Sequence, residues 1–132
     1  MLMAAGNNFR AAVEAHDLDA MSACLADDVE FFSPVAFKPF VSKPVVTALL
    51  GFVGDTFEDF VYVDDIEQGN SHMLRFSARV GDKAIDGVDL LELDEDGLIR
   101  RFSVMIRPLS AAHAMADAMS ARFEAAGGKP GA

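Results

Sequence analysis

The stretch KAIDGVDLLEL, residues 83–93, decides the fold and points to a site. Read as a β-strand, it turns successive side chains to opposite faces. One face carries Ile85, Gly87, Asp89, Leu91 and Leu93. That face is apolar except for the Asp89 carboxyl group, and burying an ionisable group is costly unless something satisfies or uses it. The alternation therefore predicts a strand that presents Asp89 to a pocket.

Three further strand-like runs surround this stretch. They are FEDFVYVDDIEQ (57–68), HMLRFSARV (72–80) and LIRRFSVMIRPL (98–109). Short segments rich in Gly, Asn and Asp separate the runs, and each suits a hairpin connection. The second half of the chain is therefore predicted to be an antiparallel meander of four strands.

The turns also predict which residues lie opposite each other. A two-residue turn at Gly81-Asp82 pairs Leu74 with Asp89 and His72 with Leu91. A four-residue loop at 94–97 pairs Asp89 with Phe102 and Leu91 with Arg100. In this register His72 and Arg100 are the diagonal neighbours of Asp89 on the inner face.

On the outer face, the same register places several Arg side chains opposite acidic ones. The Arg residues are expected to pair with Asp86 and Glu92 across the strands. Apolar side chains are interspersed among these charges: Met73, Val88, Leu90, Ile99 and Met105. A half-apolar face of this kind is unfavourable in water, so we expect a homodimer that packs through it.

Asp89 fits two roles. In the first it binds a ligand or acts as an acid, because desolvation raises the pKa of a carboxyl group, whereas a nearby Arg100 keeps it ionised. In the second it is a buried acid satisfied by Arg100 or by backbone N–H groups. His72 likewise fits either a packed histidine or a ligand contact and base.

The predicted site therefore has Asp89 and His72 as catalytic residues. The residues expected to contact a ligand are Phe9, Val13, Ser33, Phe37, Leu74, Phe76, Arg100, Phe102 and Val104. Ser33 and Phe37, with Phe31, Phe32 and Phe40, are candidates for the mouth of the pocket. Phenylalanines at this density also suit a plain core role.

The first half of the chain has helical spacing. Apolar residues predict one helix over about residues 4–15 and a second that includes Leu25. The run VEFFSPVAF (29–37) predicts a short strand, and Ser42 marks the start of a further helix. A last helix, capped by Ser110, follows the meander. Helices followed by a meander indicate an α+β fold, a curved antiparallel or mixed sheet with helices over one face.

Composition limits the partners and the setting. The chain has 132 residues and a net charge of −10, which argues against nucleic acid or an anionic membrane as the partner. We expect one domain over residues 1–126 and a disordered tail over 127–132. The single Cys24 and the lack of a signal-peptide pattern favour the cytoplasm. The spacing of His, Cys and acidic residues does not indicate a metal site, and no cofactor is expected. The acidic pair Asp64-Asp65 resembles a solvated turn and lacks the ligand spacing of a calcium site.

Three segments together resemble a known superfamily. They are HDLDAMSACLADDVEFFSPV (16–35), AIDGVDLLELDEDGLI (84–99) and RPL (107–109). Over about residues 4–119 the chain is similar to the nuclear-transport-factor-2-like superfamily, which includes SnoaL-like polyketide cyclases and ketosteroid isomerases. The resemblance implies a cone-shaped sheet wrapped by helices, a scaffold that hosts many activities.

The ketosteroid isomerases in that superfamily combine a Tyr, a general-base Asp and a protonated Asp. The resemblance matches the protonated Asp to Asp89, whereas Ser33 stands at the base position and Phe9 at the Tyr position. Two of the three groups are absent, so steroid isomerisation by that mechanism is not expected. The last-strand Asp of limonene-epoxide-hydrolase-like members is replaced by Val104. For the acid–base group of the SnoaL-like cyclases, Asp89 or His72 can stand in.

The resulting hypothesis is a small-molecule-binding domain with an apolar cavity. It would act as an isomerase, cyclase or hydrolase by acid–base chemistry on a small apolar, carbonyl-containing compound. The alternative is a non-catalytic domain for ligand binding or dimerisation.

Overall fold

The computed structural model describes residues 5–131, with side chains from residue 8 onward. Ala4, where the sequence predicts the first helix to begin, and Ala132 lie outside the described residues. The helices in this part of the chain are α1 (Ala5–Glu14), α2 (Leu18–Ala23), α3 (Lys43–Thr56) and α4 (Leu109–Ala125). Its strands are β1 (Leu25–Phe32), β2 (Phe40–Val41), β3 (Glu58–Gln68), β4 (Ser71–Val80), β5 (Lys83–Leu93) and β6 (Ile99–Arg107).

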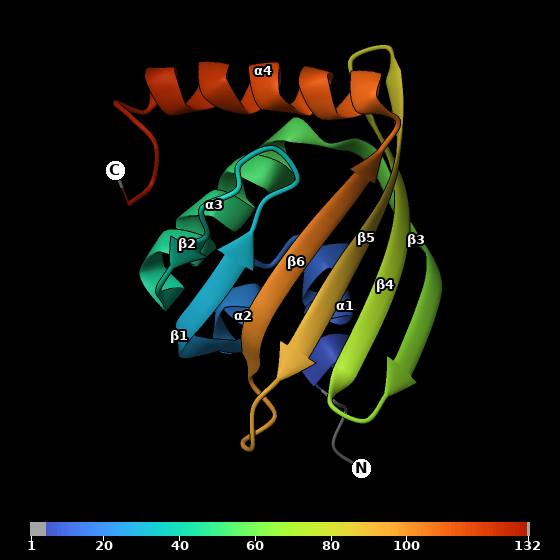
Figure 1. The fold of residues 1–132 in the computed structure, drawn as a ribbon, viewed down its shortest axis with the longest axis vertical. Coiled ribbons are helices and arrows are strands. Elements are labelled where there is room, and N and C mark those ends of the chain that lie inside the picture. Colours follow the sequence, from blue (N-terminus) through green and yellow to red (C-terminus); the bar gives the residue numbers. More distant parts are fainter. Residues whose placement is uncertain (1–4, 132) are drawn as a thin grey trace.

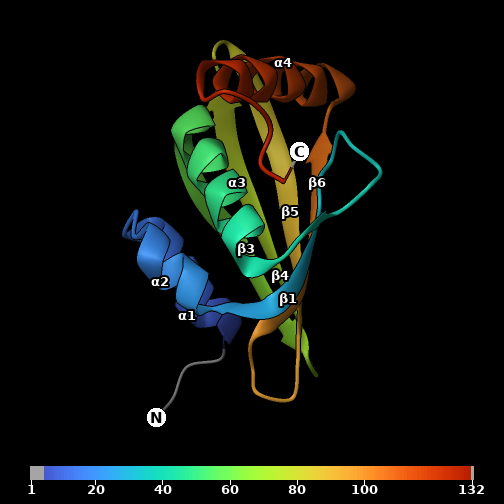
Figure 2. The same ribbon diagram turned by 90° about the vertical axis from the view of Figure 1, so that its left-hand side faces the viewer.

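The strands form one curved sheet in the order β2-β1-β6-β5-β4-β3 (Figure 1). β1 runs parallel to β6 and every other neighbouring pair is antiparallel, so the sheet is mixed. Helices α1, α2 and α3 cover one face of the sheet, and α4 crosses one end of it (Figure 2). The predicted α+β class is therefore confirmed, and the space between helices and sheet is where a cavity can form.

The register between β4 and β5 is the one that the sequence predicts. Leu74 lies opposite Asp89 and His72 lies opposite Leu91. The turn is tight because Gly81 takes a positive φ of 60°, a conformation that glycine adopts without steric cost. Asp89 therefore faces the helices, as the alternation requires.

The predicted register between β5 and β6 is wrong by two residues. Asp89 lies opposite Val104, and Leu91 lies opposite Phe102. Leu98 belongs to the loop, where its N–H donates to Asp94 Oδ1 at 2.9 Å, and an irregularity follows because Leu93 pairs with Ile99. A shift by two keeps the face of each later residue unchanged, so Phe102 and Val104 still face inward.

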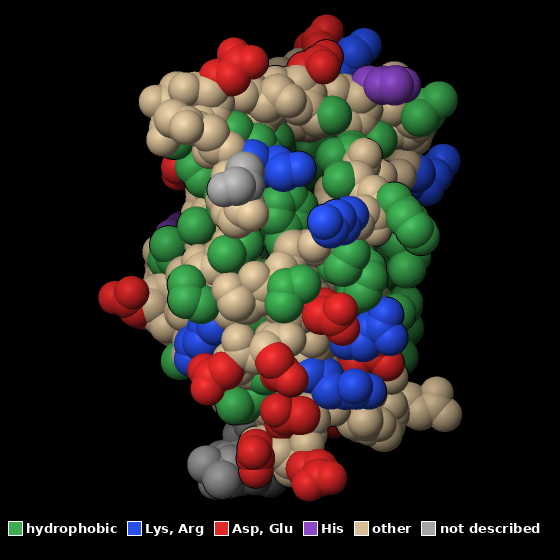
Figure 3. Space-filling view, turned by 60° about the vertical axis from the view of Figure 1, so that its left-hand side comes forward, with side chains coloured by type: hydrophobic (Ala, Val, Ile, Leu, Met, Phe, Trp, Pro, Cys, Tyr) green, Lys and Arg blue, Asp and Glu red, His purple; other side chains and the backbone are tan. Residues whose placement is uncertain are grey.

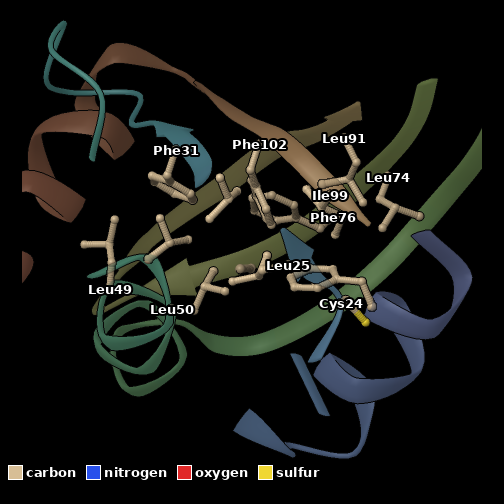
Figure 4. Packing of buried hydrophobic residues seen from close by; sticks show 14 of the residues in the cluster. Cys24, Leu25, Phe31, Leu49, Leu50, Leu74, Phe76, Leu91, Ile99 and Phe102 are labelled. Atoms are coloured by element: carbon tan, nitrogen blue, oxygen red, sulfur yellow. The ribbon is translucent and has the colours of Figure 1, made fainter. Parts of the chain in front are cut away.

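The irregularity at the start of β6 reverses two predicted positions. Ile99, expected on the outer face, is fully buried, and its side chain lies in the core near Leu91 and Phe102 (Figure 4). Arg100, expected beside Asp89 on the inner face, is exposed. The extra residue on β6 forces this exchange, because a bulge moves the following side chain to the other face.

Several predicted boundaries also need correction. Leu25 begins β1 rather than continuing the second helix, because Cys24 ends α2 as its C-cap. Asp64 and Asp65 lie within β3 and are not in a turn. The last helix begins at Leu109, one residue before the predicted cap.

In Figure 3, Lys and Arg side chains are scattered among acidic ones, and acidic side chains gather at the lower end of that face.

No helix within residues 5–131 is long and apolar enough to cross a membrane. After α4 the chain turns back, since the Gly128 N–H donates to the Phe123 carbonyl at 2.7 Å and the Lys129 amine lies 5.2 Å from the Phe40 ring centroid.

Candidate functional site

A cavity of about 540 Å³ lies between the helices and the inner face of the sheet. Its lining is largely aromatic and aliphatic: Phe9, Val13, Met21, Phe31, Leu50, Val53, Gly54, Phe57, Phe60, Val61, Phe76, Phe102, Val104 and Met115. Its polar lining residues are Glu14, His16, Asp59, Tyr62 and Asp89. A volume of this size, with few polar groups, is typical of sites for small organic molecules.

Gly87 makes room for the aromatic wall of the cavity. It lies opposite Phe76 in the sheet, and a Cβ built at Gly87 would come within 2.2 Å of the Phe76 ring. The ring therefore lies directly over the backbone of β5 and stacks on Phe60, with 4.8 Å between centroids. A glycine in a strand interior commonly marks such a close approach.

Asp89 is the buried acidic group in the lining of this cavity. It is 6% exposed, and burial raises its pKa from 3.8 to about 7, although a hydrogen bond from Tyr62 lowers it somewhat. The Tyr62 hydroxyl donates to Asp89 Oδ2 across 3.5 Å, a long hydrogen bond. Near neutral pH the carboxyl group is therefore poised between its neutral and ionised forms.

Tyr62 is the hydrogen-bond partner of Asp89, and the sequence pattern did not predict it. The predicted partners of Asp89 were Arg100 or backbone N–H groups, but Arg100 is exposed and Tyr62 takes its place. Burial raises the pKa of Tyr62, and the neighbouring Asp89 raises it further, so the phenol stays protonated. Tyr62 is the only tyrosine of the chain, and this could have drawn attention to it as a candidate site residue. Its inward direction, however, depends on an irregularity in β3, which the sequence pattern does not show.

The mouth of the cavity lies where α1 gives way to α2 and where α3 leads into β3. The exposed lining residues there are Glu14, His16, Gly54, Asp59 and Val61. Both acidic side chains are already paired, because Glu14 lies 3.4 Å from Arg10 Nε and Asp59 lies 3.0 Å from Arg79 Nη2. The mouth is thus polar, and the depth of the cavity is apolar.

His72 faces inward but does not line the cavity. It is 1% exposed, and its Nε2 is hydrogen-bonded to the Asp65 carboxylate. Its Nδ1 is buried without a hydrogen-bond partner among the described residues. The structure therefore separates the two predicted catalytic residues: Asp89 reaches the cavity, and His72 is packed against Asp65.

The residues predicted to contact a ligand divide in the same way. Phe9, Val13, Phe76, Phe102 and Val104 line the cavity beside Asp89. Leu74, Ser33, Phe37 and Arg100 do not. Leu74 is packed in the core, whereas Phe37 is 99% exposed in the connection between β1 and β2. Of the other candidates for the mouth, Phe31 lines the cavity, and Phe32 and Phe40 do not.

Within residues 5–131, no group of three or more His, Cys, Asp or Glu side chains is arranged to hold a metal ion. The buried polar groups that line the cavity are the Asp89 carboxyl group and the Tyr62 phenol, in apolar surroundings.

Comparison with known proteins places the chain in a family. A model of the SnoaL-like domain matches residues 7–102, so the chain belongs to the SnoaL-like domain family. None of the curated proteins matches the sequence. The fold is that of the nuclear-transport-factor-2-like proteins, to which the ketosteroid isomerases are related.

Solved structures support the same assignment. A steroid delta-isomerase from Pseudomonas aeruginosa is 36% identical, with a TM-score of 0.87 over 95% of this chain and 96% of the other. An uncharacterized protein with a cystatin-like fold from Silicibacter pomeroyi DSS-3 is also 36% identical, with a TM-score of 0.87 over 91% and 85%. An NTF-2 like protein from Burkholderia xenovorans LB400, 18% identical with a TM-score of 0.68 over 83% and 88%, shares the fold.

Proposed function

We propose that the cavity binds a small, mostly apolar ketone and that Asp89, in its neutral form, donates a hydrogen bond to the carbonyl oxygen. One observation carries this proposal: a carboxyl group that is 6% exposed, with a pKa raised to about 7, lines a cavity of about 540 Å³ with mainly apolar walls. A neutral acid in dry surroundings is a strong hydrogen-bond donor, and an apolar wall supplies affinity for the body of the ligand.

The chemistry that follows from this arrangement is enolisation. A base removes a proton from the carbon beside the carbonyl, the electron pair of the C–H bond forms the C=C bond, and the carbonyl oxygen accepts the proton of Asp89. Reprotonation at carbon reverses these steps and gives an isomer or the original ketone. The carboxylates of Glu14 and Asp59, which line the mouth of the cavity and are each paired with an arginine, are the candidate bases in this proposal. His72 is not given that role because its ring faces Asp65.

The steroid delta-isomerase from Pseudomonas aeruginosa supports this class of reaction, because it is 36% identical to this chain over nearly all of both chains. The chain nevertheless has Ser33 and Phe9 where the resemblance to ketosteroid isomerases expects Asp and Tyr. We therefore propose a ketone of the same general character, with Asp89 and Tyr62 as the polar pair.

Binding can be tested with Prodan, a naphthalene ketone whose emission shifts to the blue in apolar surroundings. If only neutral Asp89 binds the ketone, the affinity falls about tenfold between pH 6 and pH 8, because the neutral fraction falls by about that factor around a pKa of about 7. Asp89→Asn keeps a hydrogen-bond donor but has no proton to lose, so its affinity should not depend on pH. A wild-type affinity that is constant from pH 6 to pH 8 would contradict the proposal.

Catalysis is tested separately from binding. In heavy water, the wild-type protein should accelerate exchange of the acidic C–H protons of β-tetralone, followed by proton NMR, and Asp89→Leu should not. The non-catalytic alternative is a ligand-binding domain, which the mainly apolar lining also suits. Prodan binding without any acceleration of exchange would favour that alternative.

We also propose that two copies of the chain associate through the outer face of the sheet. This face carries exposed Val63, Ile66 and Met105 beside charges of both signs, with Arg75 and Arg107 both bonded to Asp86. Ile99 does not contribute to it, because that residue is buried. Such a mixture can pack against its own copy across a two-fold axis.

Light scattering tests this association. The wild-type protein should have the mass of two chains at micromolar concentration, and Met105→Lys should shift it toward one. Val35→Lys is the matched control, because Val35 is 48% exposed and Met105 is 54% exposed, but Val35 lies outside the sheet. A wild-type mass of one chain would exclude this dimer. We further propose the cytoplasm as the setting.

A further inference from the structure

Arg10 ties helix α1 to the wall of the cavity. Its Nη1 donates to Asp65 Oδ2 at 2.9 Å, and its Nε lies 3.4 Å from the Glu14 carboxylate. Its guanidinium carbon also lies 5.6 Å from the centroid of the Tyr62 ring. One side chain of α1 thus contacts both an acidic group of β3 and the ring whose hydroxyl donates to Asp89.

Asp65 is held from its other side by His72. One carboxylate oxygen of Asp65 accepts from Arg10, and the other contacts His72 Nε2. Burial alone would raise the pKa of Asp65, but hydrogen bonds from His72 and Arg10 outweigh it and lower the pKa below its ordinary value. Since the His72 ring is 1% exposed, the carboxylate is fixed to the core and can in turn fix Arg10.

A bulge in β3 allows Asp65 and Tyr62 to act on the same side of the sheet. Side chains three positions apart on a regular strand point to opposite faces. The pairing between β3 and β4 shifts between Tyr62 and Asp64, so that Tyr62 lies opposite Phe76 and Asp65 lies opposite Leu74. Both partners face inward, and the guanidinium of Arg10 can therefore reach both residues.

A plain surface ion pair does not account for this arrangement. Exposed Arg–Asp pairs contribute little to stability and need no aromatic ring. Here the guanidinium lies over the face of a phenol ring, which attracts a cation and restricts how the ring can move. The same helix carries Phe9 and Val13, which line the cavity.

We propose that Arg10 is a positioning residue: held by Asp65 and His72, it fixes the Tyr62 ring so that its hydroxyl stays directed at Asp89, and it keeps the α1 wall of the cavity in place. This inference rests on the proposed function of the cavity as a ketone site. Arg10 itself does not line the cavity.

The chain offers a direct spectroscopic readout of this role. Tyr62 is its only tyrosine and it has no tryptophan, so the near-ultraviolet circular dichroism in the tyrosine band reports on Tyr62 alone. Arg10→Gln is expected to weaken that band in the absence of any ligand and to raise the Kd for Prodan by about threefold to tenfold. Asp65→Asn should have the same two effects, and the double variant should add little to either single one.

Arg101→Gln is the matched control. Arg101 also pairs with an acid, Glu92, at 3.4 Å, and its guanidinium carbon lies 4.8 Å from the Phe32 ring centroid, but neither it nor these partners line the cavity. Its removal should leave the tyrosine band and the Prodan affinity unchanged. An unchanged tyrosine band in both Arg10→Gln and Asp65→Asn would overturn the inference, whatever happens to Prodan binding. Failure of the wild-type protein to bind Prodan would count against the proposed function instead, and the tyrosine band would still decide the role of Arg10.

Discussion

Replacing Asp89 with Asn should remove a pH dependence of stability that one buried group creates. Burial raises the pKa of Asp89 from 3.8 to about 7 in the folded protein. A raised folded pKa contributes stability that is fully present below the unfolded pKa and is lost as the pH rises through the folded pKa. The free energy of unfolding of the wild-type protein should therefore decrease as the pH rises toward 7.

The size of this loss of stability follows from the change in the pKa of Asp89 on folding. A pKa of about 7 in the folded protein, against 3.8 in the unfolded chain, corresponds to a total loss of stability of about 4 kcal/mol. About 3 kcal/mol of that loss is expected between pH 5 and pH 8. Asp65 and Asp86 have lowered pKa values, so their contributions are lost only as the pH falls below about 4, outside this window.

Urea unfolding followed by far-ultraviolet circular dichroism at pH 5, 6, 7 and 8 measures this directly. Across the series the wild-type protein should lose about 3 kcal/mol more stability than Asp89→Asn. Asp86→Asn is the control, because Asp86 is an acid of the same strand that pairs with Arg75 and Arg107 on the outer face, and it should keep the wild-type slope. Equal slopes in the wild-type protein and Asp89→Asn would refute the reasoning.

Three further substitutions have expected outcomes in the same unfolding assay. Gly87→Ala should destabilise the protein by about 1–3 kcal/mol, because the new Cβ would lie 2.2 Å from the Phe76 ring. The control Gly54→Ala lies in a helix with nothing within 4 Å of the new Cβ, so it should stabilise the protein by about 0.5–1 kcal/mol. Equal effects of the two substitutions would show that the Phe76 ring moves aside at little cost. Arg100→Gln should change stability by less than about 0.5 kcal/mol and leave the pH dependence intact because Arg100 is exposed, and a loss of that dependence would restore its predicted place beside Asp89. Arg122→Gln should cost about 1–2 kcal/mol, since its guanidinium donates to Thr56 Oγ1 and to the Asp55 carbonyl, both at 2.7 Å. No loss would mean that these two hydrogen bonds do not contribute to holding α4 against α3.

Alternation in residues 83–93 was sufficient to predict the direction of Asp89. The hairpin at Gly81-Asp82 has the geometry that its residues favour, so the pairing of Leu74 with Asp89 follows from the sequence. Helices followed by a meander predicted the α+β class, and the family resemblance predicted the superfamily, with which the SnoaL-like model over residues 7–102 agrees. The outer ion pairs of Asp86 and Glu92 were also predicted, because charges facing each other across strands follow from register.

Irregularities in the strands explain what the sequence did not reveal. A regular two-residue hairpin at Gly69-Asn70 would place Tyr62 opposite Ser77, on the outer face. The bulge in β3 instead places it opposite Phe76, beside Asp89. Bulges depend on tertiary packing and leave little trace in a local pattern, so Tyr62 could not be assigned to the site from spacing alone.

The irregularity at the start of β6 removed a predicted residue from the site, whereas the bulge in β3 added one. The extra residue at the start of β6 turned Arg100 outward and buried Ile99, so the predicted charged neighbour of Asp89 was absent from the inner face. Without a cation beside it, the balance between desolvation and charge is decided by desolvation, and the pKa of Asp89 rises. The sequence was compatible with either a raised or a lowered pKa of Asp89, and the bulge in β6 determines that the pKa is raised.

The most direct measurement of the central claim is the titration of the Asp89 carboxyl carbon by carbon-13 NMR, with Asp89→Asn used to assign the resonance. We predict a midpoint near pH 7, and a still higher one in Tyr62→Phe, because the hydrogen bond from Tyr62 lowers the pKa of Asp89. A midpoint near 4, the ordinary value for an aspartic acid, would contradict the account of Asp89 as a buried acid that faces an apolar cavity.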